Sequence, residues 1–134
     1  MSKTIGIIGT RSRNSFADFD LTRQVFDTIY EDGDTMVSGG CPQGGDRFAE
    51  LIAKHRSIPI HYVPEGSSEL KEGYLNIHPA FWSKYGKRAG FIRNTYIARD
   101  AQVLMAVVAD DRVGGTEDTI NKYVKMGKDR LILV

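Results

Sequence analysis

Short apolar runs alternate with amphipathic helical patterns along the chain, and this alternation limits the fold more than any other feature. The runs are Thr4–Ile8, Thr35–Val37, Ile58–Val63, Val103–Val108 and Leu131–Val134. Five strands alternating with four helices predict an α/β class, a Rossmann-like three-layer α/β/α fold with a mostly parallel five-stranded sheet. Pro59 cannot donate to a strand ladder, so the third strand is expected to be peripheral.

Apolar residues at helical spacing indicate which side of each helix faces the core. The expected faces carry Leu21, Val25 and Ile29 with Phe26 beside them in the first helix, Phe48, Leu51, Ile52 and His55 in the second, Ala89, Ile92 and Tyr96 in the third, and Ile120, Tyr123, Val124 and Gly127 in the fourth. The third helix is expected to begin near Trp82 or Gly86. Residues 64–81 are rich in glycine, serine and proline and predict an inserted loop.

Length and composition predict one domain over residues 1–134. The net charge of +1 provides no overall field for gripping DNA or an anionic membrane. One cysteine fits a reducing compartment, and the absence of a long apolar segment predicts a cytoplasmic protein with no membrane partner. The three histidines lack paired ligand spacing, so neither a metal nor a cofactor is expected.

Two glycine-rich turns lie between an apolar run and a helical pattern, Ser38-Gly39-Gly40-Cys41-Pro42-Gln43-Gly44-Gly45-Asp46 and Val113-Gly114-Gly115-Thr116. A third candidate is Gly9-Thr10-Arg11. Such a turn lets the backbone approach a ligand closely and aims free N–H groups at an anion, typically a phosphate. Right-handed crossovers place the carboxyl ends of parallel strands at one edge, so the turns are expected to converge there.

The segment between Gly73 and Arg99 contains basic residues and no acidic ones. Arg93 lies on the helix expected to start at the ligand edge, and a guanidinium suits phosphate because it donates two parallel hydrogen bonds. The neighbouring Asn94 offers an amide to a base or ribose. The other basic residues of the segment are expected to be solvated surface charges, namely Lys84, Lys87, Arg88 and Arg99.

Several residues have two interpretations. Thr116 and Asp46 either contact the ligand, through phosphate and ribose respectively, or cap their helices. Cys41 fits a buried cysteine better than a nucleophile, since no histidine is tied to it in sequence. Trp82 and Tyr85 either stack on a base or pack in the loop and core.

The order of these motifs resembles YspA-type proteins of the SLOG superfamily, which are related to the Smf/DNA-processing and "lonely guy" (LOG) groups. The segments that carry the resemblance are Gly9-Thr10-Arg11, Ser38 through Asp46, Trp82 with Tyr85-Gly86-Lys87-Arg88-Ala89-Gly90, Arg93-Asn94 and Gly115-Thr116. The resemblance implies a nucleotide or nucleotide-derived ligand, held by the glycine turns and the Arg-Asn pair. Several relatives act as ligand sensors.

The enzymatic LOG branch has Pro-Gly-Gly-x-Gly-Thr-x-x-Glu, and its glutamate serves hydrolysis of a nucleotide's N-glycosidic bond. Thr119 stands at that glutamate position here, and the proline is absent. Glu117 and Asp118 are the substitute catalytic candidates, since a carboxylate stabilises an oxocarbenium-like state. Both also suit the positive dipole end of a helix without any catalytic role.

The leading hypothesis is a protein that binds a nucleotide-like small molecule as a sensor or to sequester it. The alternatives are a LOG-like phosphoribohydrolase and a single-stranded DNA binder that uses the 84–99 patch and Trp82. A homo-oligomer is also expected, with Tyr74, Leu75, Ile77 and Phe81 as its interface candidates.

Overall fold

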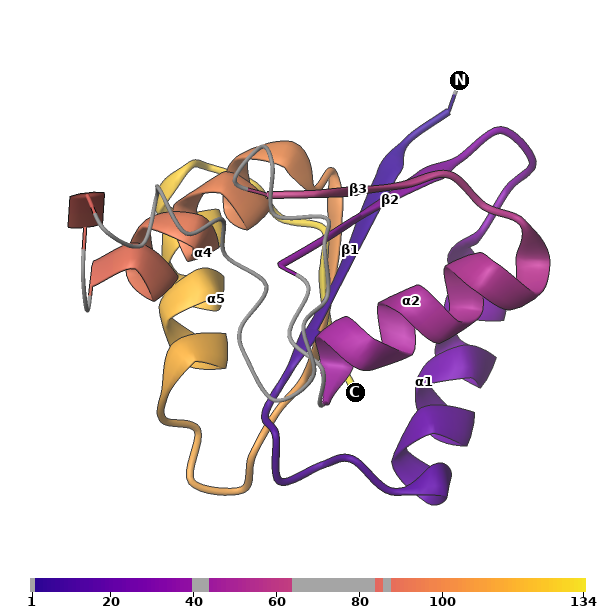
Figure 1. The fold of residues 1–134 in the computed structure, drawn as a ribbon, viewed down its shortest axis with the longest axis horizontal. Coiled ribbons are helices and arrows are strands. Elements are labelled where there is room, and N and C mark those ends of the chain that lie inside the picture. Colours follow the sequence, from indigo (N-terminus) through magenta and orange to yellow (C-terminus); the bar gives the residue numbers. More distant parts are fainter. Residues whose placement is uncertain (1, 40–43, 64–83, 86–87) are drawn as a thin grey trace.

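A computed structural model of the chain describes residues 2–39, 44–63, 84–85 and 88–134. The strands are β1 (Thr4–Gly9), β2 (Thr35–Ser38), β3 (Ile60–Tyr62), β4 (Val103–Val107) and β5 (Leu131–Leu133). The helices are α1 (Phe16–Ile29), α2 (Gly45–Arg56), α4 (Ala89–Asp100) and α5 (Gly115–Lys125). Helices α1 and α2 cover one face of the sheet, and α4 and α5 cover the other (Figure 1). The predicted three-layer α/β arrangement is confirmed.

All strand pairs are parallel, and the strand order is β3-β2-β1-β4-β5. The chain moves outward from β1 to β3 and then returns to β4 on the other side of β1. Strand order therefore reverses between β1 and β4, where Gly9 pairs with Val107 at the carboxyl ends. Open α/β sheets bind ligands at this kind of position. The prediction that the strand after Pro59 is peripheral is confirmed, because β3 lies at the sheet edge.

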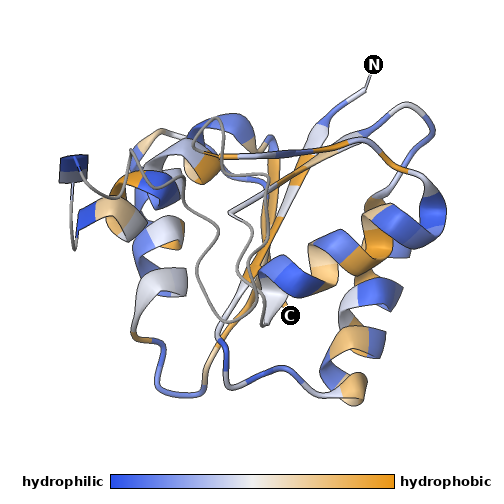
Figure 2. Cartoon of the chain, viewed as in Figure 1, coloured by the Kyte–Doolittle hydropathy of each residue, from blue (hydrophilic) through white to orange (hydrophobic). Residues whose placement is uncertain are grey.

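Two apolar layers hold the sheet between its helices. One includes Phe26 of α1 and Ile52 of α2, and the other includes Ile97 of α4 and Tyr123 of α5. Hydrophobic residues accordingly follow the strands and the inner sides of the helices (Figure 2). The inner strands β1, β2 and β4 are buried on both faces, which explains their continuous apolar sequences, whereas the edge strands β3 and β5 are partly exposed.

The expected helix faces were partly wrong. Leu21 is 44% exposed, because α1 turns Thr22 and Phe26 toward the sheet, and the Thr22 hydroxyl is satisfied by the carbonyl of Asp18. Val124 is 54% exposed, since it lies 100° around α5 from the buried Tyr123.

Four further positions depart from the expected faces. His55 is exposed, Gly127 lies beyond the end of α5, and α4 buries Asn94 and Ile97 more deeply than Ile92 or Tyr96. The expected start of the third helix, near Trp82 or Gly86, falls outside the described residues.

The loop between β1 and α1 is held by Arg13. Its guanidinium donates to the carbonyls of Val108 and Val134 at 3.2 and 2.6 Å and pairs with Asp18 at 3.1 Å. Asp18 also forms a capping box with Ser15 at the start of α1. The loop that follows β1 is thereby anchored to the ends of β4 and β5.

A buried ion pair joins the start of β1 to the segment before β2. Lys3 Nζ lies 2.6 Å from Asp34 Oδ2, and the two side chains are 7% and 0% exposed. Burial acts to raise the pKa of the Asp34 carboxyl. Hydrogen bonds from the Lys3 side chain and from the backbone N–H groups of Lys3 and Glu31 outweigh that effect, so the pKa lies below 3.8.

Asp34→Asn is expected to lower the free energy of unfolding by about 3 kcal/mol, because it leaves Lys3 buried without its carboxylate. The lowered pKa of Asp34 stabilises the fold above pH 3.8, and this contribution disappears as the pH falls through the folded-state pKa. Urea unfolding at pH 7 and pH 2 should therefore show a difference between wild type and variant that shrinks in acid.

The exposed Asp32→Asn serves as the control and is expected to change stability by less than about 0.5 kcal/mol. An equal effect of the two substitutions at pH 7 would contradict the assigned role of the Lys3–Asp34 pair.

Within the described residues, no helix has the length and apolar character needed to cross a membrane.

Candidate functional site

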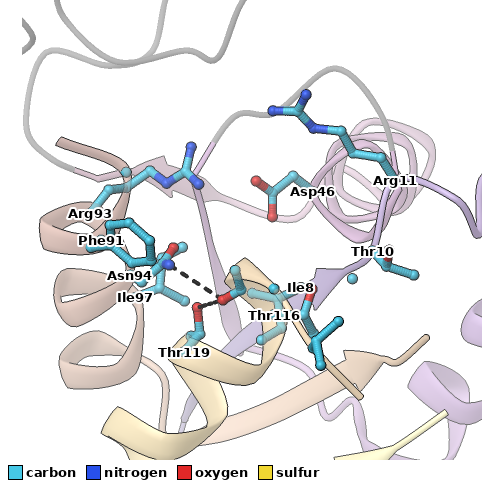
Figure 3. Close-up of a pocket in the computed structure, with 15 residues that line it drawn as sticks. Ile8, Thr10, Arg11, Asp46, Phe91, Arg93, Asn94, Ile97, Thr116 and Thr119 are labelled. Atoms are coloured by element: carbon cyan, nitrogen blue, oxygen red, sulfur yellow. Dashed lines mark hydrogen bonds between the residues drawn. The ribbon is translucent and has the colours of Figure 1, made fainter. Parts of the chain in front are cut away.

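A cavity of about 400 Å³ opens at the switch point between β1 and β4, bounded by α4 and α5 (Figure 3). Several of the predicted ligand-binding residues line it, namely Gly9, Thr10, Arg11, Asp46, Arg93, Asn94, Gly114, Gly115 and Thr116. Segments that are far apart in the sequence therefore meet around one space. This convergence follows from the parallel topology.

Other predicted residues do not line the cavity. Ser38, Gly39 and Gly44 are not among the described lining residues, and neither are Glu117 and Asp118 of α5. Gly40, Cys41, Trp82, Lys87 and the segment 64–81 fall outside the described residues, so the predictions that involve them remain predictions.

Sequence reasoning missed part of the lining. These residues are Ile8, Gly90, Phe91, Ile97, Val113 and Thr119. Phe91 and Val113 are 54% and 65% exposed, and the available sequence signal was that each adjoins a glycine, Gly90 and Gly114.

The glycines of the turns after β1 and β2 allow the start of α2 to pack against the end of β1. A Cβ on Gly45 would lie 2.1 Å from the carbonyl carbon of Ile8, and one on Gly44 would lie 2.6 Å from the carbonyl oxygen of Thr10. Gly9 has no more room, since its Cβ would come within 3.0 Å of the Gly45 nitrogen. The start of α2 thus presses directly on the end of β1, and the Gly44 N–H donates to Asn14 Oδ1 at 2.9 Å.

The glycines of the α5 turn face open space. Among the atoms of the described residues, a Cβ on Gly114 would meet none within 4 Å, and one on Gly115 would meet Asn94 Nδ2 alone, at 3.8 Å. Gly114 has φ +103, which favours glycine, and it is the N-cap residue of α5. In the described part of the chain no side chain caps this helix start, so the capping interpretation of Thr116 is wrong and its contact with a ligand stays a prediction. Gly44 likewise replaces Asp46 as the N-cap residue of α2, again with no side-chain cap.

Arg93 reaches across the cavity from α4. Its guanidinium points toward the Asp46 carboxylate, with Arg11 on the far side (Figure 3). The missing side chain at Gly39 makes room for it, because a Cβ there would lie 2.9 Å from Arg93 Nε. Both Nε and Nη1 of Arg93 are buried, and neither has a hydrogen-bond partner among the residues that the structure describes. Buried donors without partners are costly, so this site favours an acceptor entering the cavity.

Helix α2 carries two acidic groups at this end of the sheet. Glu50 lies one turn after Asp46, and burial raises the pKa of its carboxyl, opposed by a hydrogen bond from Tyr62 and reinforced by the charge of Asp46. Asp46 lines the cavity from α2 and Arg93 lines it from α4, whereas Glu50 does not belong to the described lining.

Glu117 and Asp118 are both engaged in ion pairs. The Glu117 carboxylate accepts two hydrogen bonds from Arg112, at 2.7 and 2.9 Å. Asp118 Oδ2 accepts from Lys122 Nζ at 2.6 Å and from Asn94 Nδ2 at 3.2 Å. Their catalytic role remains a prediction.

No protein-family model matches the chain, and no curated protein sequence matches it. Among solved structures, the chain is similar to the molybdenum cofactor binding protein from the phototrophic bacterium Rippkaea orientalis. The TM-score is 0.69 at 18% sequence identity, over 99% of this chain and 76% of that one. The likeness shows the fold. The resemblance to YspA-type SLOG proteins stays a prediction.

Gly45→Ala and Gly115→Ala should separate the two kinds of glycine. Gly45→Ala is expected to lower the free energy of unfolding by about 3 kcal/mol, because the backbone of Ile8 cannot yield to the new Cβ. Gly115→Ala has room and should leave stability unchanged or raise it by up to about 1 kcal/mol. Denaturant unfolding of both variants measures this. A comparable loss in Gly115→Ala would contradict the openness of the α5 turn.

Proposed function

We propose that the protein binds a small phosphorylated ligand of the nucleotide type in this cavity, and that it acts as a sensor or sequesters the ligand. The observation that carries the proposal is the buried pair of nitrogens on Arg93, which have no hydrogen-bond partner in the described part of the chain and line the same cavity as the start of α5. A phosphate oxygen would satisfy these donors and gain charge-assisted hydrogen bonds.

The start of α5 supplies the second half of the phosphate site. Gly114 and Gly115 leave its first turn uncovered, and the positive end of a helix dipole favours an anion there. Together with Arg93, it would hold the phosphate from two sides.

Apolar residues at the cavity support a ligand with a flat ring. Phe91 and Val113 are exposed at the cavity, and Ile97 is buried beside them. An aromatic face exposed beside an anion site suits stacking against a heteroaromatic ring. The molybdenum cofactor, which the solved neighbour is named for binding, belongs in the ligand panel beside nucleotides and ADP-ribose derivatives.

Arg93→Gln is expected to weaken binding of the nucleotides in that panel about 10- to 100-fold, since hydrogen bonds to a charged group contribute about 1.5–3 kcal/mol. Isothermal titration calorimetry gives the Kd values. The matched control is Arg99→Gln on the same helix, whose guanidinium pairs with Asp100 and does not line the cavity. Failure of the wild type to bind any member of the panel would overturn the proposal.

The same pair of variants tests the single-stranded DNA alternative. Arg93 and Arg99 both belong to the basic segment 84–99, so oligonucleotide binding that weakens in both variants and falls steeply with salt would favour that function instead.

We expect a bound nucleotide to be recovered intact. A hydrolase needs a carboxylate at the sugar, whereas Glu117 is held by Arg112, and Asp118 by Lys122 and Asn94. Chromatography of AMP after incubation with the protein would detect free adenine. Release of adenine that vanishes in Glu117→Gln or Asp118→Asn would establish the phosphoribohydrolase instead.

A further inference from the structure

The neighbours of Asn94 permit only one orientation of its side-chain amide. Nδ2 lies 3.3 Å from the Gly115 carbonyl oxygen and 3.2 Å from Asp118 Oδ2 (Figure 3 shows the first contact). A carbonyl oxygen only accepts hydrogen bonds, so the amide nitrogen must face it and the amide oxygen cannot. The orientation therefore follows from chemistry.

Asp118 Oδ2 is a hydrogen-bond acceptor, because it also binds the ammonium group of Lys122. Lys122 Nζ donates to Asp118 Oδ2 at 2.6 Å and to the Phe91 carbonyl at 2.7 Å. A lysine ammonium has donors and no acceptor, so the oxygen it faces is an acceptor too. These bonds run from α4 through α5 and back to Asn94 on α4, which fixes the amide against rotation.

The amide oxygen of Asn94 is left for the cavity. Asn94 is 5% exposed and lines the cavity beside Gly115. Among the residues that the structure describes, none donates to its Oδ1. The cavity therefore presents a fixed acceptor next to the proposed phosphate site, and such an acceptor favours a ligand with a donor at that place.

We infer that Asn94 Oδ1 accepts a hydrogen bond from a sugar hydroxyl of the ligand, so that the site selects ribonucleotides over deoxyribonucleotides. This inference rests on the proposed phosphate site. An ionised phosphate carries no donor, and the sugar hydroxyls are the donors closest to it in a nucleoside 5′-monophosphate. Asp118 acts here as a positioning residue, because it turns the Asn94 oxygen toward the ligand and does not touch the ligand itself.

The test compares AMP, GMP, CMP and UMP with their 2′-deoxy and 3′-deoxy forms by isothermal titration calorimetry. For the wild type, we expect loss of one of the two hydroxyls to raise Kd about three- to tenfold, the equivalent of one neutral hydrogen bond. The ratio of the deoxy to the ribo Kd is taken within each variant, so a general change in affinity cancels.

Asn94→Leu is expected to bring this ratio close to one, and Asp118→Leu is expected to lower it. Asn94→Leu removes the acceptor, while the Gly115 carbonyl keeps the Thr119 hydroxyl and Asp118 keeps Lys122. Asp118→Leu removes the oxygen that Lys122 and Asn94 share, so the Gly115 carbonyl alone is left to orient the Asn94 amide. The control Asp129→Asn removes an exposed carboxylate outside the cavity and should retain the wild-type ratio.

Each outcome decides the matter. A wild type that binds ribo and deoxy forms equally, or an Asn94→Leu protein that still discriminates, overturns the inference and leaves the proposed phosphate site standing. A ratio lost in Asn94→Leu but unchanged in Asp118→Leu overturns the positioning role. Absence of binding by every monophosphate overturns the inference, and the proposed function falls with it when the other members of the ligand panel also fail to bind. If Asp118→Leu fails to fold, the wild type and Asn94→Leu still test the hydroxyl contact.

Discussion

The close approach of α2 to the end of β1 is the constraint on which the site depends. Gly45 lies against the backbone of Ile8, at a distance that leaves no room for a side chain. Because glycines line this contact on both sides, the start of α2 reaches the switch point of the sheet and carries Asp46 to the cavity. A larger residue at Gly45 would push the helix away from the sheet edge.

On the opposite face, α4 and α5 are joined by polar contacts that also shape the cavity. Lys122 of α5 bonds the Phe91 carbonyl of α4, and Asn94 of α4 bonds the Gly115 carbonyl of α5. The helices therefore keep a fixed separation at the place where the start of α5 stays uncovered. The same contacts determine which atoms can bind a ligand, because a donor that is hydrogen-bonded within the protein is not available to the ligand.

Much of the site could be predicted from parallel topology alone. Gly9, Arg93 and Gly115 were expected at one edge of the sheet, and all of them line the cavity. The roles of the glycines could not be predicted, because the sequence Gly-Gly before a helix is the same whether the missing side chains make room for a strand or for a ligand. The prediction of the buried helix face failed where two apolar residues are adjacent in sequence, as at Tyr123 and Val124, because only packing decides which of them faces the core.

The alternation of apolar and amphipathic segments, by itself, determined the class of the fold and the sheet edge at which the turns meet. Those features depend on the order of elements and the handedness of their connections, which are local properties of a chain. Only the tertiary structure decided that β1 occupies the space where a Gly45 side chain would lie and that the corresponding space at Gly115 is open. It also decided that the amide nitrogen of Asn94 faces α5. Such outcomes depend on the distance between atoms far apart in sequence, and no pattern of residue types contains that distance.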